Sequence, residues 1–238
     1  MLAGSRNWNN KRTGKARFSL NYYCYWVLGD RNTSFLHLVS RRLKRFTHNS
    51  THLITPFDSG GSSAKLREAF GMLSVGDLRN RMIALADESV QGNPAVYELF
   101  SHRLPSAGEG ADPASLRARL EEICAGEDPL IARVPVPLGE IIQNYIGFFR
   151  AAMPADFDLR GASIGNLILA GGYLNHGQRI EPVLFLFSKL VEVRGNVRAV
   201  VTDDLHLVAE LQSGEAVIGQ HRITGKELPP LRSRIVDL

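Results

Sequence analysis

Asp58-Ser-Gly-Gly-Ser-Ser63 joins a short apolar run to a helical pattern, and the chain then continues through Gly71 into Gly76-Asp-Leu-Arg-Asn80. Two helices are therefore expected to begin at neighbouring loops, and the first of these loops follows a strand. Free backbone amides at a helix start attract anions, and an aspartate at a strand end can hold a metal ion or a hydroxyl group. The segment predicts a site for a phosphate-bearing ligand.

The pattern on both sides of this segment alternates strands with helices. We expect helices over 35–46, from a Ser62 or Ser63 cap to Gly71, from an Asp77 cap to Asp87, after Pro113, from Leu138, over 164–174 and from Pro182. Strands are expected over 52–57 and 197–201, and a hairpin over 205–220. Strands separated by helices predict an α/β fold with a mainly parallel sheet and a late antiparallel hairpin.

Charge is distributed unevenly along the 238 residues. Residues 1–57 contain ten Lys and Arg but only Asp30 as an acidic residue, a net charge of +9, so the rest of the chain sums to −5. A basic segment of this kind can contact RNA or an anionic surface. Its composition nevertheless favours a poorly ordered, solvated extension over residues 1–34. We therefore expect no nucleic-acid partner.

Cysteine usage and hydropathy predict a soluble protein of the cytoplasm. Cys24 and Cys124 lack CxxC spacing, so neither a disulfide framework nor a zinc site is indicated. The seven histidines show no metal-ligand spacing either. No segment approaches the roughly 18 uninterrupted apolar residues that span a bilayer, and no small-residue cleavage site follows the apolar stretch 18–28. We expect no membrane partner.

The loop residues have structural alternatives to a role in binding. Asp58 can bind Mg²⁺, orient a hydroxyl nucleophile or act as a base, but it can equally be a turn aspartate that bonds its own backbone. Taken alone, Gly60-Gly61-Ser62-Ser63 has neither the lysine of a Walker loop nor the spacing of a dinucleotide fingerprint. Spacing therefore leaves both interpretations open.

Residues at the next two helix starts pose the same choice. Asp77 is explained by helix capping alone, although Arg79 next to it offers a fork for phosphate and Asn80 offers a donor and an acceptor. Arg160, Ser163 and Asn166 repeat this chemistry within a second small-residue loop, Asp158-Leu-Arg-Gly-Ala-Ser-Ile-Gly-Asn166. Capping and solvent exposure are the alternative for these three residues.

Several linked motifs carry a family resemblance in their order and spacing. They are Thr55–Phe70, Val75–Asn80 with Ala84–Asp87, Gly161–Leu167 and Leu205–Glu210. Across about residues 36–228 the chain resembles the CofD-like proteins, which include 2-phospho-L-lactate transferase and the related gluconeogenesis-factor branch. The amino-acid sequence of the first motif is most similar to sequences of the bacterial CofD-like branch found beside ATP-grasp-type genes.

The resemblance implies a Rossmann-like fold and two kinds of activity. Active members transfer a phospholactyl group from a guanylyl diester to the hydroxyl of a deazaflavin, with Mg²⁺, and release GMP; other members bind nucleotide sugars and regulate metabolism. A guanine nucleotide or nucleotide sugar is thus the expected ligand, a deazaflavin-like molecule the expected acceptor, and Mg²⁺ the expected cofactor. The oligomeric state, a homo-oligomer included, is left open.

The resemblance also implies roles for single residues. Asp58 and Asp77 are the expected catalytic residues, with Asp58 as the metal ligand and Asp77 against the acceptor. The expected substrate- and phosphate-binding residues are Ser59, Gly60, Gly61, Ser62, Ser63, Arg79, Asn80, Ser163 and Asn166. Carboxylates with Mg²⁺ and loop amides suit phosphoryl transfer, which needs charge neutralisation and positioning more than covalent help.

The chain departs from the family pattern at two places. The family has a Gly-Gly-Thr loop where this chain has Arg31-Asn-Thr-Ser-Phe35, and it continues past the hairpin into a further carboxyl-terminal portion. We therefore expect a CofD-like α/β domain over 35–238 that is incomplete at its carboxyl end. Three hypotheses follow: a transferase, a non-catalytic nucleotide or nucleotide-sugar binding regulator, and a truncated relative that binds nothing.

Overall fold

The computed structural model describes residues 23–24, 33–89, 92–225 and 231–237. Its helices are α1 (Thr33–Leu43), α2 (Gly61–Phe70), α3 (Gly76–Leu85), α4 (Pro94–Ser101), α5 (Pro113–Ala125), α6 (Pro129–Ala132), α7 (Val136–Ala152), α8 (Ile164–Asn175), α9 (Glu181–Leu190), α10 (Gln220–Thr224) and the 3₁₀ turn η2 (Ala107–Glu109). Its strands are β1 (Tyr23–Cys24), β2 (Thr51–Ile54), β3 (Asn196–Ala199), β4 (Val208–Leu211), β5 (Ala216–Ile218) and β6 (Ile235–Asp237).

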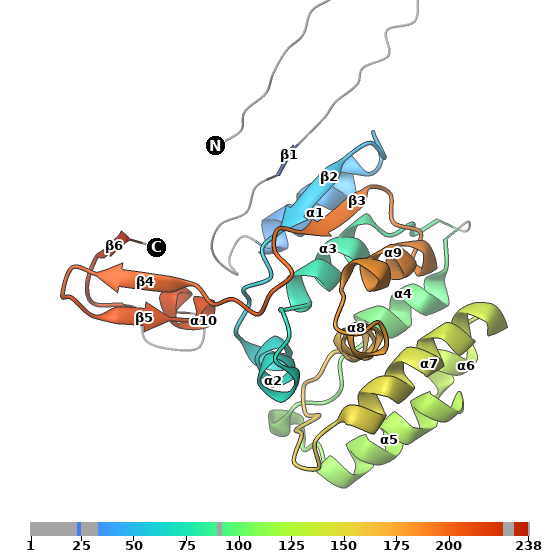
Figure 1. The fold of residues 1–238 in the computed structure, drawn as a ribbon. Coiled ribbons are helices and arrows are strands. Elements are labelled where there is room, and N and C mark those ends of the chain that lie inside the picture. The colour runs from blue at the N-terminus through green and yellow to red at the C-terminus, as the bar shows by residue number, and fades with distance from the viewer. Residues whose placement is uncertain (1–22, 25–32, 90–91, 226–230, 238) are drawn as a thin grey trace, which may run out of the picture.

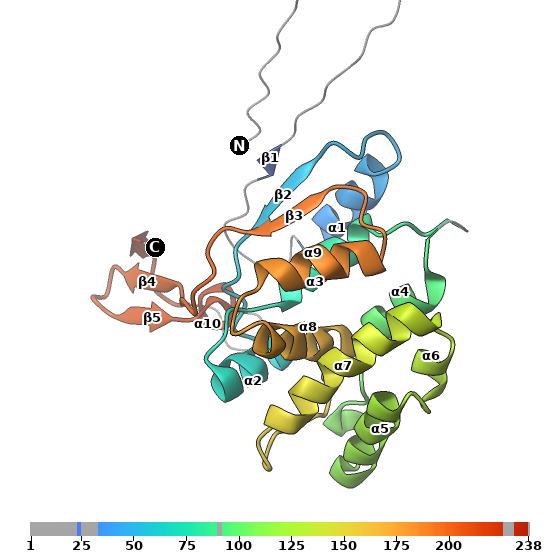
Figure 2. The ribbon, with the colours of Figure 1, turned by 45° about the vertical axis from the view of Figure 1, so that its right-hand side comes forward.

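A small parallel sheet in the order β1-β2-β3 forms one side of the main body (Figure 1). Strand β2 pairs with β3 from Thr51 opposite Asn196 to Ile54 opposite Ala199. Helices α3 and α9 contact the sheet, α8 packs against both of them, α7 packs against α8, and α5 packs against α7 (Figure 2). The polypeptide after β2 and after β3 therefore emerges at the same edge of the sheet.

Helix α8 runs through the centre of this helical stack. All ten residues from Ile164 to Tyr173 are buried, because the segment carries no charged side chain and is covered by neighbouring helices. Gly171 lets the backbone of α7 approach closely: a Cβ atom placed on it would lie 1.8 Å from the carbonyl oxygen of Tyr145. Glycine is required there by space, and this contact fixes where α8 begins relative to α7.

A second, antiparallel sheet stands beside the main body. We call residues 205–225 and 231–237 the hairpin unit; it contains β4, β5, β6 and α10, with sheet order β5-β4-β6. Its small core, formed by Ala209, Leu211, Val217 and Ile223, is separate from the main core. Helix α10 is the part of the unit nearest to the main body (Figures 1 and 2).

The predicted α/β class, the parallel sheet and the late hairpin are confirmed. Two caps were predicted wrongly. The residue before α2 is Gly60, with Ser62 and Ser63 in the first turn. The residue before α3 is Val75, so Asp77 lies inside the helix, where its charge still suits the positive helix end.

Most of the predicted extension over 1–34 lies outside the described residues. Within it, Tyr23–Cys24 pairs with β2 and α1 begins at Thr33. Helices α4 and α6 had not been predicted from the sequence. Each begins with proline after a capping Asn or Asp, Asn93 for α4 and Asp128 for α6, a local signal that the apolar spacing did not reveal. Among the described residues, no helix is both long enough and apolar enough to cross a bilayer.

Candidate functional site

Three helices begin around the loop that follows β2. The loop runs from Thr55 to Gly60 and leads into α2, and the next loop leads into α3. A hydrogen bond from the Ser74 amide to the Pro56 carbonyl, 3.1 Å, ties these two loops together. Helix α8 contacts both α2 and α3. The amide-rich ends of three helices of ten residues or more therefore face one region.

Gly76, the first residue of α3, is the point at which the side chains from these elements meet. A Cβ atom placed on Gly76 would lie 2.5 Å from Ser63 Oγ, 3.1 Å from Asp58 Oδ2 and 3.9 Å from Asn166 Nδ2. Only glycine leaves room for this convergence. We call Asp58, Ser62, Ser63, Gly76 and Asn166 the Gly76 cluster.

Hydrogen bonds inside the cluster orient its polar groups. Asn166 Nδ2 donates to Ser62 Oγ at 3.0 Å, which joins the start of α8 to the start of α2. The Gly60 amide donates to Asp58 Oδ1 at 3.1 Å, which is the turn-aspartate bond expected of an Asx turn. Asp58 thus fills its structural role with one oxygen, while its other oxygen, Oδ2, faces Gly76 and Ser63. The two interpretations of Asp58 do not exclude each other.

Several polar atoms around the cluster are buried without a hydrogen-bond partner within the described part of the chain. They include Asn166 Oδ1, Ser163 Oγ and Ser74 Oγ, and the residues are 2%, 0% and 1% exposed. A buried polar atom left unpaired costs on the order of 1–3 kcal/mol, so a group of them calls for an explanation. A ligand that supplies polar atoms at this place would satisfy them.

Arg79 bonds to Asn80 and to the backbone at the end of α4, and its side chain lies against Gly165 at the start of α8. Arg79 Nη1 donates to the Phe100 carbonyl at 3.1 Å, and Nη2 donates to Asn80 Oδ1 at 2.6 Å. Burial, and secondarily Arg103, lowers the pKa of Arg79 to about 10, so it remains cationic at neutral pH. Two of its nitrogens are therefore engaged by protein groups, and its role in binding phosphate stays a prediction.

The remaining predicted site residues lie at the margin of the cluster. Asp77 is half-buried in the first turn of α3, close enough to Arg79 to oppose the lowering of that side chain's pKa. Ser163 immediately precedes α8 but makes no side-chain capping bond. Gly61 is exposed, with a φ of +49° that favours glycine. Ser59 bonds to His221 of the hairpin unit at 2.8 Å.

Four contributors were absent from the sequence-based set. Gly76 lies in the motif Val75–Asn80 and Ser74 directly precedes it, and a glycine in the first turn of a helix is a signal of close approach that could have pointed to Gly76. His221 lies 162 residues from its partner Ser59 in the loop, and Arg67, which contacts the loop carbonyls of Phe57 and Asp58, bonds to Asp204, 137 residues away. No local sequence pattern predicts such contacts.

The donor set is compatible with the magnesium ion that the family resemblance implies. Mg²⁺ binds to proteins through one or two carboxylates and completes its shell with water and substrate phosphates. Asp58 Oδ2 and the unpaired Asn166 Oδ1 are hard oxygen donors of this kind, and both belong to the cluster around Gly76. Among the described residues, no group of three or more His, Cys, Asp or Glu forms a closed metal site. The residues suit an ion that shares its ligands with a phosphate.

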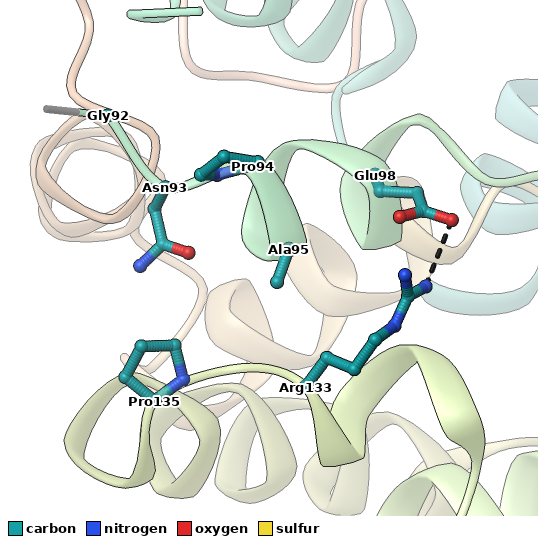
Figure 3. A pocket seen from close by; sticks show the side chains of 7 residues that line it. All are labelled: Gly92, Asn93, Pro94, Ala95, Glu98, Arg133 and Pro135. Atoms are coloured by element: carbon teal, nitrogen blue, oxygen red, sulfur yellow. Dashed lines mark ion pairs between the residues drawn. The ribbon is translucent and has the colours of Figure 1, made fainter. Parts of the chain in front are cut away.

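A separate cavity of about 450 Å³ opens at the amino-terminal end of α4 (Figure 3). Its lining residues are Gly92, Asn93, Pro94, Ala95, Glu98, Arg133 and Pro135. The Glu98–Arg133 ion pair, 2.9 Å long, lies on its rim with both side chains more than half exposed. An exposed ion pair of this kind contributes little energy. The cavity shares no residue with the Gly76 cluster and offers no buried polar side chain, so we do not assign it the main function.

Fold and site together define a Rossmann-like α/β domain whose polar loops converge beyond the carboxyl ends of parallel strands. The family model described as 2-phospho-L-lactate transferase CofD matches residues 36–237. The chain belongs to the CofD family, as the sequence motifs predicted.

Curated relatives and solved structures agree with this assignment. The chain is 30% identical over 183 residues to a candidate gluconeogenesis factor of a Nostoc species, covering 77% of this chain and 28% of that protein. It is 27% identical over 188 residues to the gluconeogenesis factor of Bacillus subtilis, covering 79% and 42%. A crystal structure of a UPF0052 family member from Bacillus halodurans covers 84% of this chain and 46% of its own, with a TM-score of 0.55 and 25% identity.

The chain spans less than half the length of these relatives. The matched region contains β2, β3, all the helix starts of the site and the hairpin unit. The prediction that this chain is most similar to the branch found beside ATP-grasp-type genes stays a prediction.

Proposed function

We propose that this chain binds the phosphate groups of a guanine nucleotide or nucleotide sugar at the Gly76 cluster. The observation that carries the proposal is that three groups converge on Gly76. They are a carboxylate from the loop before α2, a hydroxyl from α2 and a side-chain amide from α8. The amide groups at the starts of α2, α3 and α8 would bind phosphate oxygens. The unpaired Ser163 Oγ and Asn166 Oδ1 add polar atoms at the start of α8.

The first candidate activity is a transfer of the 2-phospho-L-lactate transferase type. A hydroxyl of a deazaflavin-like acceptor would attack the phosphorus of the phospholactyl group, the P–O bond to the guanylyl group would break, and GMP would leave. Bound Mg²⁺ would supply charge neutralisation for the phosphates. Asp58 would hold the ion or orient the acceptor hydroxyl, Asp77 would contact the acceptor, and Asn166, fixed by Ser62, would orient the substrate.

The second candidate is a regulator that binds a nucleotide or nucleotide sugar without turnover. The names of the relatives favour it, because the proteins from Nostoc and Bacillus subtilis are named as gluconeogenesis factors rather than as transferases. The same cluster would serve both candidates, since each requires binding of phosphate groups. Turnover is what distinguishes them.

Isothermal titration calorimetry tests the shared part of the proposal. GDP, GTP and a UDP-sugar would each be titrated into the protein with and without Mg²⁺, and we expect heat of binding for at least one of them that increases with Mg²⁺. No heat with any of the three would reject both candidates. If the chain binds one of these ligands, it would then be incubated with a guanylyl-lactate diester and a deazaflavin. Release of GMP supports the transferase, and binding without release supports the regulator.

Other predicted properties accompany this proposal. We propose a cytoplasmic location, no nucleic-acid partner and no membrane partner, on the basis of charge distribution and hydropathy in the sequence. Size-exclusion chromatography with light scattering would determine whether the chain forms a homo-oligomer.

A further inference from the structure

Among the described residues, two groups of hydrogen bonds join the hairpin unit and the segment before it to the main body, and both end on α2 or the loop before it. In the first, Ser59 Oγ lies 2.8 Å from His221 Nδ1 and accepts a bond from the His221 amide at 3.2 Å. Ser59 follows Asp58 directly in the chain. Packing is tight at this contact, because a Cβ atom on Gly219 would lie 3.3 Å from Ser59 Oγ and from the His221 ring.

The second group is centred on Arg67 of α2, whose side chain is 3% exposed. Its Nε and Nη2 donate to Asp204 Oδ1 at 2.8 and 2.5 Å, and Nη2 also donates to the Leu205 carbonyl at 2.6 Å. On its other side, Nη1 lies 3.3 and 3.4 Å from the carbonyl oxygens of Phe57 and Asp58. One guanidinium group therefore bridges the segment leading into the hairpin unit and the backbone that carries Asp58.

These contacts bear on the orientation of Asp58, although their hydrogen bonds end on its backbone carbonyl and on the adjacent Ser59 rather than on its carboxylate. Within the loop, the Gly60 amide bonds to the Asp58 carboxylate. From outside the loop, Arg67 bonds to the Asp58 carbonyl, and His221 bonds to the adjacent Ser59. Because the core of the hairpin unit is separate from the main core, the unit can respond to polar contacts without repacking the body. A change in how the unit docks would therefore move the loop Thr55–Gly60, which we call the ligand loop, before it disturbed α8.

We propose that His221 is a positioning residue for the ligand loop, and that ligand binding at the Gly76 cluster and docking of the hairpin unit are coupled. His221 holds Ser59 so that the Asp58 carboxylate keeps its orientation toward Gly76. By thermodynamic reciprocity, a ligand that stabilises this loop also stabilises the docked hairpin unit. The ligand part of this inference rests on the proposed function, whereas the positioning of the loop by His221 does not.

The test compares His221→Ala with His221→Asn, which places a polar atom near the position of Nδ1, and with Arg222→Ala. Arg222 is the exposed neighbour on the same helix and is the matched control. GDP with Mg²⁺ is titrated into each protein at 150 mM salt, where exposed charges are screened. Coupling free energies correspond to about fivefold or more in affinity, so we expect His221→Ala to weaken GDP binding at least fivefold. His221→Asn should recover most of that loss, and Arg222→Ala should resemble the parent chain.

Amide hydrogen exchange supplies the readout that a purely structural role of His221 would not move. GDP should slow the exchange of peptides covering 208–223 in the parent chain but not in His221→Ala. Equal GDP affinity and equal exchange in both proteins would overturn the proposal. If the parent chain binds none of GDP, GTP and the UDP-sugar, the proposed function fails on its own, and exchange over 57–63 decides the positioning role. Faster exchange in His221→Ala than in Arg222→Ala supports that role, and identical exchange rejects it.

Discussion

The main body and the hairpin unit are built in different ways. The body is a stack of helices on a parallel sheet, and its central helix α8 has ten consecutive buried residues. Among its described residues, the hairpin unit buries four hydrophobic residues in a core of its own, and it meets the body through the hydrogen bonds of His221 with Ser59 and of Arg67 with the Leu205 carbonyl. This difference teaches that the body determines overall stability and the position of the Gly76 cluster. The hairpin unit contributes hydrogen bonds to one loop of the site, Thr55–Gly60.

The largest effect should come from the closest backbone contact in the body. In Gly171→Ala the new Cβ atom would overlap the Tyr145 carbonyl, and neither backbone can move without separating α7 from α8. We expect a loss of roughly 3 kcal/mol or more in the free energy of unfolding, measured by urea denaturation. Gly147→Ala is the control, because that helical position has open space and should gain roughly 0.5–1 kcal/mol. Similar stabilities for the two variants would contradict the assigned packing.

Acid should expose a second difference between the two regions. His52 is 3% exposed in β2, and its burial, with a smaller contribution from Arg81, lowers its pKa to about 4. The unfolded chain binds a proton at His52 below about pH 6.5 and the folded chain does not, so stability is lost as pH falls from about 6.5 to 4. The loss should reach roughly 2–3 kcal/mol.

Urea denaturation of His52→Gln at pH 7 and pH 4.5 tests this expectation. The variant should lose less stability on acidification than the parent chain does, because it has no imidazole to protonate. His206→Asn changes an exposed histidine of the hairpin unit and is the matched control. If His52→Gln and the parent chain show the same pH dependence, burial of His52 does not govern it.

The ligand site should respond to a change of charge without a change of fold. Asp58→Asn keeps the shape of the side chain but removes the charge that faces Gly76 and Ser63. We expect Mg²⁺-dependent GDP binding to weaken by more than tenfold, about 1.4 kcal/mol or more, in calorimetric titrations. Asp156→Asn, at an exposed carboxylate, should bind like the parent chain. Unchanged affinity in a folded Asp58→Asn would leave Asp58 with its turn role alone.

The smallest effect on the whole molecule should come from the core of the hairpin unit. Leu211→Ala removes one of its four buried hydrophobic side chains. Amide exchange over 208–218 should become faster, while the free energy of unfolding of the main body changes by less than about 1 kcal/mol. Leu78→Ala in the main core should instead cost about 2–5 kcal/mol. Equal losses in both variants would show that the two cores unfold as one.

Much of the fold could be predicted because its signals are local. The stop of α2 at Gly71, with φ +57°, and the start of α5 at Asp112-Pro113 follow from backbone rules within one turn. The apolar runs likewise predicted α7, α8 and α9. The predicted caps of α2 and α3 were wrong because they, too, were chosen from local signals alone. Ser62, Ser63 and Asp77 are good capping residues in isolation, but α2 and α3 begin one or more residues earlier, after Gly60 and Val75.

The candidate site was predicted in part. Asp58, Ser62, Ser63 and Asn166 do lie together, although Ser62 and Asn166 are 104 residues apart. The family motifs supplied that grouping, since the spacing of the residues alone left each of them between a structural and a binding role. The contacts of Arg79 with Phe100 and of Ser59 with His221 were not foreseen. Both join elements that are adjacent only in the folded chain.

By itself, the sequence determined the α/β class, the positions of most helices and the family, because periodicity, caps and linked motifs act over short distances along the chain. The tertiary structure decided which polar groups face one another. Gly171 allows α7 to approach α8, that packing contributes to the position of Asn166 at the start of α8, and Gly76 leaves the space into which Asp58 and Ser63 point. Distances between such groups depend on the packing of whole helices, a property that no single segment of sequence contains.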